Sequence, residues 1–364
     1  MKLSKNIFAL AVSFVVSGIL IFVGCNSSSN GTGTVEPYAA GVLYVANQTS
    51  ATVYRFDVET MTRIDSISSV IVAPHWIEFS PDGQNYYLNG RLVPAQMAKF
   101  RVSDNSFVDS VSVSGNLIPT AMVITADNST GYICDFGATT PPGRIHKYNL
   151  NTMSFIDDSI RTGALSHDLK ISSDRSLTVA CSRGTDDVTL VYLPDDTVFI
   201  FPLDSTDIRP SPPVHEPYGV VIDHNDSLAY IACLKSGQVR VVDLINRKNI
   251  DSMIIPYTPD PNHLTTSGPT LMAISPDNSK LFVTTQFGNV VVVVDLNPKS
   301  MTQIPLSTPR PFGIKMNADG SKVFVACVNE SNMPGSIYVI DGNTLMKIDS
   351  VVVGLNSFSL AWQP

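Results

Sequence analysis

Charged residues are scarce in this chain, and most of the charge that it carries is negative. Asp, Glu, Lys and Arg make up 15% of its 364 residues, and the formal net charge is −8. Globular proteins commonly contain about 25% charged residues. No cluster of Lys and Arg offsets the acidic balance, so the chain should repel a phosphate backbone. We therefore expect no nucleic-acid partner.

Several motifs of known chemistry are absent as well. The sequence has no C-x-x-C pair, which excludes the usual zinc spacing and the C-x-x-C-H attachment of haem. It has no nucleophile elbow, zinc-protease helix motif or phosphate-binding loop. Helical periodicity is missing after the N-terminal segment. We therefore predict no metal and no cofactor, and no catalytic residue can be named.

The long apolar run lies at the N-terminus. Lys2 and Lys5 precede a nearly apolar stretch at residues 7–24, and a Ser-, Asn- and Gly-rich run follows Cys25. This pattern is typical of a secretory signal. The segment "FVGC" resembles the lipobox of bacterial lipoproteins, with Phe22 in place of the usual Leu. The resemblance implies cleavage before Cys25 and a lipid on its sulfur; the alternative is an ordinary signal peptide with a chance cysteine.

Three segments follow from this interpretation. Residues 1–24 are the lipoprotein signal peptide, residues 25–40 a lipid-anchored flexible linker, and residues 41–364 a single folded domain. The residue after the cysteine is Asn26. In the Gram-negative sorting that this segment resembles, an Asp at that position would retain the protein in the inner membrane. We expect an envelope protein anchored to the outer membrane, facing the periplasm or the cell surface, and a monomer.

A repeated Asp-Ser pair organises the domain. The pair recurs at intervals of 44 to 49 residues, with one interval of 98, and its Asp residues are Asp65, Asp109, Asp158, Asp204, Asp251 and Asp349. A period of this length predicts a repeat architecture. Each unit reads as an alternating run, a four-residue turn with Asp, and three more short runs, the last containing Asp-Ser. Such β-branched, turn-bounded runs are strands.

Seven units of this kind predict an all-β fold, a seven-bladed β-propeller of four-stranded antiparallel blades. The first unit lacks its inner strand, and the last residues of the chain provide one. We expect "SLAWQ" to pair with "GVLYVAN" and close the ring. Asp-Ser should mark the outermost strand, where polar residues discourage edge-to-edge pairing. O-glycosylation at Asp-Ser is the alternative.

The repeat sequences resemble a known family. The segments "LYVAN", "VVVVVDL" and "PFGIKMNADGSKVFVAC" are similar to the YVTN repeat of surface-layer and YncE-like β-propellers. The resemblance covers residues 41–364. It implies a superfamily that also holds 6-phosphogluconolactonase-like lactonases and the haem d1 and quinoprotein propellers. Because one fold hosts many activities, it does not choose among them.

Three cysteines occupy one repeat position, in "TVAC", "YIAC" and "FVAC". Cys181, Cys233 and Cys327 should be held apart by whole blades, so we expect buried thiols rather than disulfides.

The candidate site lies where the loops are long. In this topology the second-to-third loops and the blade-to-blade loops share one face, and insertions collect there, notably at residues 205–216 and 255–268. The candidate ligand-binding residues on this face are His75, His167, His215, Tyr218, His263, Arg310 and Phe312. A ring of these residue types over a channel suits a small ligand or an anion. Metal binding by the histidines is one alternative, and hydrogen bonding to neighbouring blades is another.

Two functions remain open. We expect a non-catalytic binding propeller that holds a protein, peptide, glycan or small molecule on the long-loop face over the central channel. The alternative is a lactonase-like hydrolase or a redox-type enzyme with its site at the channel mouth.

Overall fold

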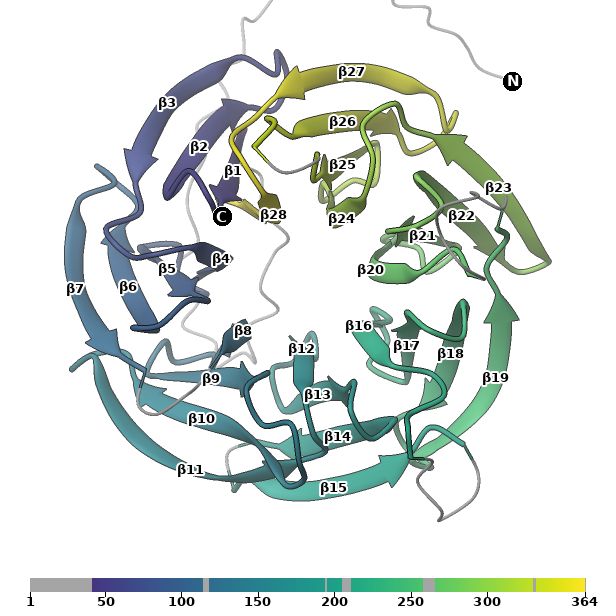
Figure 1. Cartoon of the computed structure of the whole chain (residues 1–364), viewed down its shortest axis with the longest axis horizontal. Coiled ribbons are helices and arrows are strands. Elements are labelled where there is room, and N and C mark those ends of the chain that lie inside the picture. Colours follow the sequence, from purple (N-terminus) through teal and green to yellow (C-terminus); the bar gives the residue numbers. More distant parts are fainter. Residues whose placement is uncertain are drawn as a thin grey trace, which may run out of the picture. The chain divides into compact units, whose positions relative to one another are not determined.

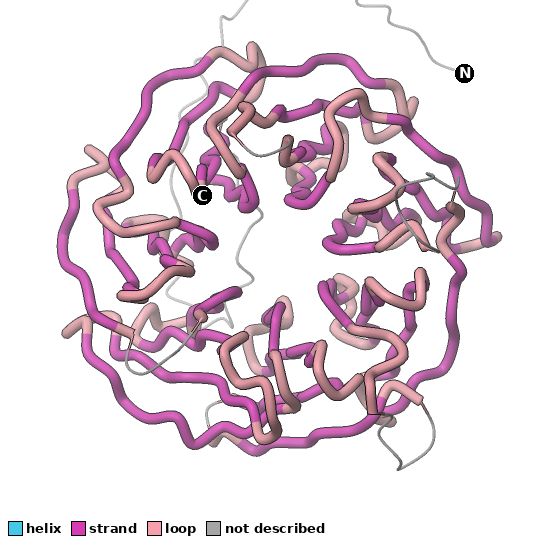
Figure 2. Tube along the Cα trace, viewed as in Figure 1, coloured by secondary structure: helices cyan, strands magenta, loops and turns pink. Residues whose placement is uncertain are grey.

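Seven four-stranded antiparallel sheets surround a central channel in the computed structural model (Figure 1). The structure describes residues 41–113, 118–193, 195–204, 211–257, 266–329 and 332–363. Within these ranges no residue is helical (Figure 2), and no helix is long and apolar enough to cross a membrane. The predicted all-β, seven-bladed propeller is confirmed.

In every blade the first strand lies beside the channel and the fourth lies at the outer rim (Figure 1). Blade 1 contains, from the channel outward, β28 (Ser357–Trp362), β1 (Val42–Asn47), β2 (Thr52–Asp57) and β3 (Arg63–Ser68). Blade 2 contains β4 (Pro74–Phe79), β5 (Asn85–Gly90), β6 (Gln96–Arg101) and β7 (Phe107–Ser112). Blade 3 contains β8 (Pro119–Ile124), β9 (Thr130–Asp135), β10 (Gly143–Asn149) and β11 (Ser154–Thr162). Blade 4 contains β12 (Ser166–Ile171), β13 (Leu177–Ser182), β14 (Asp187–Tyr192) and β15 (Thr197–Pro202).

The remaining three blades have the same arrangement. Blade 5 contains β16 (Pro217–Ile222), β17 (Leu228–Cys233), β18 (Gln238–Asp243) and β19 (Lys248–Ile254). Blade 6 contains β20 (Pro269–Ile274), β21 (Lys280–Thr285), β22 (Val290–Leu296) and β23 (Lys299–Pro305). Blade 7 contains β24 (Pro311–Met316), β25 (Lys322–Cys327), β26 (Ser336–Asp341) and β27 (Lys347–Val352).

The two ends of the propeller meet in blade 1, as predicted. β28 pairs antiparallel with β1, with Leu43 opposite Trp362 and Val45 opposite Leu360. The chain ends as an inner strand of the blade in which the domain begins (Figure 1). Because the ring closes by strand pairing, β1 does not lie at an unpaired edge of its sheet.

The hydrophobic core lies between neighbouring blades. Strand alternation sends Leu43 and Val45 toward blade 7, where they pack in one cluster with Phe324. Tyr44 and Ala46 point the other way and pack against blade 2. The four cysteines in the described residues, among them Cys181, Cys233 and Cys327, are buried and free, which confirms the expectation of unpaired thiols.

The Asp-Ser motif follows a β-bulge in the outer strand. In β3 the registers Arg55–Asp65 and Phe56–Arg63 leave Ile64 as the extra residue. Equivalent bulges occur in blades 2, 3, 5 and 7, and the extra residues Ile64, Val108, Ile156, Ile250 and Ile348 are 41% to 51% exposed. A bulge twists an edge strand and interrupts its ladder, which discourages pairing with another chain.

One of the six Asp-Ser pairs was predicted in the wrong place. Asp204 lies beyond the end of β15 rather than in an outer strand. Its carboxylate is instead bound to His215 and Arg240 on the side of blade 5. A buried imidazole and a guanidinium supply stronger partners than an exposed strand edge, so this copy of the motif serves the junction between two blades.

Candidate functional site

The second residue of every inner strand lies at the long-loop end of the channel. Around the ring these residues are His75, Thr120, His167, Tyr218, Thr270, Phe312 and Phe358. Proline precedes five of them, in β4, β8, β16, β20 and β24. Register shifts follow at the same place, for example between Pro74 and Trp76. The repeat therefore places one side chain per blade at the same depth of the channel.

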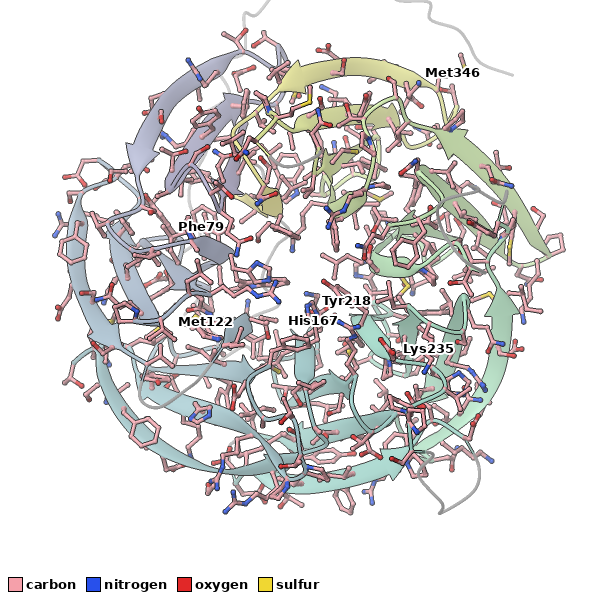
Figure 3. The ribbon with its side chains drawn as sticks, viewed as in Figure 1. Phe79, Met122, His167, Tyr218, Lys235 and Met346 are labelled. Carbon is pink, nitrogen blue, oxygen red and sulfur yellow. The ribbon has the colours of Figure 1, made fainter. Side chains whose placement is uncertain are left out.

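Five of the rings at this level or beside it, and one from the loop after β9, pack into a continuous layer, which we name the aromatic floor: His75, Phe136, His167, Tyr218, Phe312 and Phe358. Phe136, the residue after β9, joins the layer through His167, with ring centroids 5.2 Å apart. His75 and Phe312 lie on either side of Phe358, with ring centroids 5.1 and 4.9 Å from it. The ring centroid of Tyr218 lies 3.8 Å from that of His167 and 6.2 Å from that of Phe312. Figure 3 shows His167 and Tyr218 beside the central opening. The layer leaves a cavity of about 20 Å³, and about one water molecule fits such a volume.

The two histidines of the floor are neutral. His167 donates from Nδ1 to the carbonyl oxygen of Tyr218 at 2.9 Å, so its Nε2 carries the lone pair. That Nε2 and the Nδ1 of His75 are buried and have no hydrogen-bond partner in the described residues. Burial lowers the pKa of His75 to about 3. Burial, helped by His75, Arg91 and Arg183, also holds the pKa of His167 well below its usual value. Both imidazoles are therefore uncharged and can accept a hydrogen bond from a bound molecule.

Three arginines stand around the floor on the long-loop side, and we name Arg91, Arg183 and Arg310 the arginine mouth. Arg91 and Arg183 directly follow β5 and β13 and lie 5.6 and 5.8 Å from the ring centre of Phe136. Arg310 lies 5.8 Å from the ring of Phe312, and its backbone is left-handed at φ 55° just before β24. Burial raises the pKa of Tyr218 above its usual value. The positive charges of all three arginines oppose this rise.

The arginines differ in their partners. Arg183 is held by Glu216, with an Nη2–Oε2 distance of 2.6 Å. Among the described residues, neither Arg91 nor Arg310 has an ion pair or a side-chain hydrogen bond to a carboxylate. Two guanidinium groups that lack an anionic partner in the described part of the chain form a local site that favours an anion, in a protein with a net charge of −8.

The structure brings together five of the residues predicted from the sequence. His75, His167, Tyr218 and Phe312 line the small cavity, and Arg310 stands over Phe312. His215 is separate from this group: its Nε2 lies 3.0 Å from Asp204 Oδ2 and 2.9 Å from Arg240 Nη2. His263 lies outside the described residues, as do Cys25 and most of the two insertions.

Sequence reasoning missed Arg91, Phe136 and Phe358. Arg91 and Phe136 share one repeat position, the residue after the second strand, whose N–H binds the carbonyl that precedes the inner strand. An alignment of that position across the blades would have found them. In the described residues no group of three or more His, Cys, Asp and Glu side chains is arranged to hold a metal ion.

Comparison with known proteins identifies the family. The family model described as "Lactonase, 7-bladed beta-propeller" matches residues 42–346. The chain belongs to this lactonase family of seven-bladed β-propellers. No protein of curated function matches the sequence significantly.

Solved structures agree on the fold of this lactonase-family chain. A periplasmic gluconolactonase from Pseudomonas aeruginosa is 16% identical, with a TM-score of 0.69 over 88% of this chain and 98% of that one. A proposed 6-phosphogluconolactonase from Bacteroides fragilis is 14% identical, with a TM-score of 0.69 over 88% and 97%. Hydrazine synthase from Kuenenia stuttgartiensis is 14% identical, with a TM-score of 0.65 over 92% and 100%. At these identities the likeness shows the fold alone.

Proposed function

We propose that this chain is a binding propeller whose arginine mouth holds a small anionic ligand of the sugar-acid class. The observation that carries the proposal is the pair of guanidinium groups, Arg91 and Arg310, that face an aromatic floor and have no carboxylate partner among the described residues. Guanidinium groups bind carboxylate or phosphate through two parallel hydrogen bonds, and aromatic rings pack against the apolar faces of sugars. The gluconolactonases among the structural neighbours support the choice of sugar acids over other anions.

Titration of gluconate and 6-phosphogluconate into the purified chain tests this proposal. Arg91→Gln and Arg310→Gln should each weaken binding at least tenfold, since a hydrogen bond to a charged group contributes about 1.5–3 kcal/mol. Arg63→Gln, at an exposed arginine of β3, is the matched control and should bind like the parent chain. Equal affinities in all four proteins, or no binding at all, would contradict the proposal.

Hydrolysis of a sugar lactone at the same mouth is the second candidate, favoured by the family match and by the two neutral imidazoles. A water in the cavity between them would attack the lactone carbonyl carbon, and the ring C–O bond would break. The proton of that water would pass to an imidazole and then to the leaving alkoxide, giving a hydroxy acid. The arginines would stabilise the oxyanion.

Acid release from glucono-lactone separates the two candidates. If hydrolysis occurs, His167→Gln should lose turnover at least a hundredfold and keep its affinity for gluconate, because the arginines are unchanged. If the parent chain binds gluconate but does not hydrolyse the lactone, the proposal of a binding function stands and the proposal of lactone hydrolysis is rejected.

The remaining expectations about the chain belong to the same proposal. We propose that the repeats are of the YVTN type and that the propeller is a monomer held to the outer membrane through a lipid on Cys25. A lipid anchor would keep the mouth close to solutes of the cell envelope, where the Pseudomonas gluconolactonase is also located by its description.

A further inference from the structure

A second and larger cavity lies deeper in the channel, on the other side of the aromatic floor. It has a volume of about 260 Å³ and reaches from Trp76 and Phe358 to His224, in the turn after β16. Leu271, Ala273 and Val221 provide an apolar wall, and Lys170 and Lys315 also line it. The arginine mouth contributes none of its residues to this lining.

Two charged residues of the lining, Lys170 and Lys315, occupy one repeat position, the fifth residue of the inner strand, and Asp168 lines the cavity from the third residue of β12. Around the ring this level contains Glu78, Val123, Lys170, Val221, Ala273, Lys315 and Ala361. Because these strands share one register, the three charged residues lie at a common depth of the channel. They come from blades 2, 4 and 7, and the other four positions are apolar.

Lys170 already has its partners. Its ammonium lies 3.0 Å from Asp168 Oδ1 and 4.4 Å from the ring centre of Trp76. The second oxygen of Asp168 accepts a hydrogen bond from the N–H of Val220 in blade 5 at 2.9 Å. This buried carboxylate therefore joins two blades and neutralises Lys170.

Lys315 and Glu78 lack comparable partners. In the described part of the chain the Lys315 ammonium makes no hydrogen bond or ion pair, and the Glu78 carboxylate accepts only from the Trp76 indole, at 3.3 Å. Burial lowers the pKa of Lys315 and raises that of Glu78. Among the cations that oppose the effect on Glu78, Lys315 is the strongest, ahead of Lys170 and Arg175. Half-buried charges of both signs thus lie at one cavity: Lys315 is part of its lining, and Glu78 is bonded to the lining residue Trp76. Each charge is costly to leave without a partner.

We propose that this cavity is a second binding site, for a small zwitterion of the α-amino-acid class. The ligand carboxylate would pair with Lys315, its ammonium with Glu78 beside the Trp76 ring, and its side chain would contact Leu271 and Ala273. A simple carboxylate would leave Glu78 without a partner, and a simple amine would leave Lys315 without one. A ligand that carries both charges satisfies both residues, and this gives the site its selectivity.

Calorimetric titration of the purified full-length chain tests the proposal. The probes are glycine, L-valine and L-leucine, with 4-methylpentanoate and 3-methylbutylamine as analogues of leucine that each lack one charged group. We expect saturable binding of at least one amino acid, and at least tenfold weaker binding of both analogues. If none of the amino acids binds, or if 4-methylpentanoate binds as tightly as leucine, the proposal is overturned.

Variants test whether Lys315 and Glu78 are the two residues that bind the charged groups of the amino acid. Lys315→Met and Glu78→Gln should each weaken amino-acid binding at least tenfold, whereas Lys315→Arg should retain most of it. Lys280→Met, at a half-buried lysine of β21 paired with Asp295, is the control and should bind normally. Arg91→Gln should also leave amino-acid binding intact, which separates this site from the mouth. Unfolding curves establish that each variant is folded, and unchanged affinity in folded Lys315→Met would refute the assignment.

Discussion

His167 donates a hydrogen bond from Nδ1 to the main-chain carbonyl of Tyr218 in the next blade, across 2.9 Å. The two rings also pack with their centroids 3.8 Å apart. Since a carbonyl can only accept, this bond fixes the tautomer and leaves the lone pair on Nε2. The same side chain therefore joins blades 4 and 5 and supplies an acceptor to the floor of the candidate site.

Acidification should weaken the fold through these histidines. The pKa of His75 in the folded protein is about 3, whereas that of an unfolded histidine is about 6.5. The unfolded chain therefore binds a proton first, and stability falls as the pH drops from about 6.5 toward 3. By pH 5 the loss from His75 alone should be about 2 kcal/mol, with His167 adding in the same direction. Urea unfolding curves between pH 7 and pH 5 measure it.

Histidine variants test whether His75 and His167 cause this loss of stability at low pH. His75→Gln combined with His167→Gln should flatten the pH dependence in this range, where most carboxylates stay ionised. His224→Gln, at an exposed histidine, should keep the slope of the parent chain. An equally steep slope in the double variant would show that other groups control acid stability.

Gly219 allows two inner strands to approach each other closely. A Cβ at this position in β16 would lie only 2.1 Å from the carbonyl oxygen of Thr270 in β20. Gly219→Ala should therefore cost at least 1–3 kcal/mol (about the cost of overpacking a core), because backbone must move. Gly41→Ala is the control, since no atom lies within 4 Å of its added Cβ. The prediction fails if thermal unfolding shows the two variants to be equally stable.

The fold was predictable because its signals are periodic. The closing strand was found because "SLAWQ" has the pattern of the other inner strands, and β28 does pair with β1. Asp204 misled the repeat alignment because a sequence motif does not reveal its partners: His215 and Arg240 reach it only after blades 4 and 5 pack together. Tertiary contact, rather than local pattern, decided that position.

The candidate sites were only partly predictable, for a related reason. Loop length drew attention to the long-loop face, and four of the predicted residues do meet there around one cavity. The deeper cavity is built from strands, where Lys170 and Lys315 interrupt apolar runs in "DLKI" and "GIKM". A charged residue at a core position of a strand is itself a signal. That these charged residues share one level of the channel could be recognised only from the radial arrangement, which brings residues from blades 2, 4 and 7 to one depth.

Membrane attachment should depend on Cys25. If its sulfur carries the lipid, Cys25→Ala should move the protein from the membrane fraction to the soluble fraction and leave its unfolding curve unchanged. In the proposed anchor, the acyl chains on this sulfur would be the attachment to the bilayer. Fractionation with immunoblotting, with Cys134→Ala as a control at a buried thiol, provides the measurement. A Cys25→Ala protein that stays with the membranes would disprove lipid anchoring.

Removal of the closing strand should abolish the fold rather than weaken it. Deleting residues 355–364 removes β28, whose Leu360 and Trp362 pack in the cluster between blades 1 and 7. Burial of each large apolar side chain contributes about 1.5–3 kcal/mol, and the backbone ladder to β1 is lost as well. The total approaches the about 5–15 kcal/mol that stabilises a typical domain, so we expect insoluble protein.

Deleting only Gln363 and Pro364 removes one backbone hydrogen bond, from Gln363 to Val42, and should cost about 1 kcal/mol. Expression of both truncations, followed by sedimentation and thermal unfolding, compares them. A soluble longer truncation with the stability of the shorter one would mean that β1 does not need β28, and that the ring is held closed by blade packing alone.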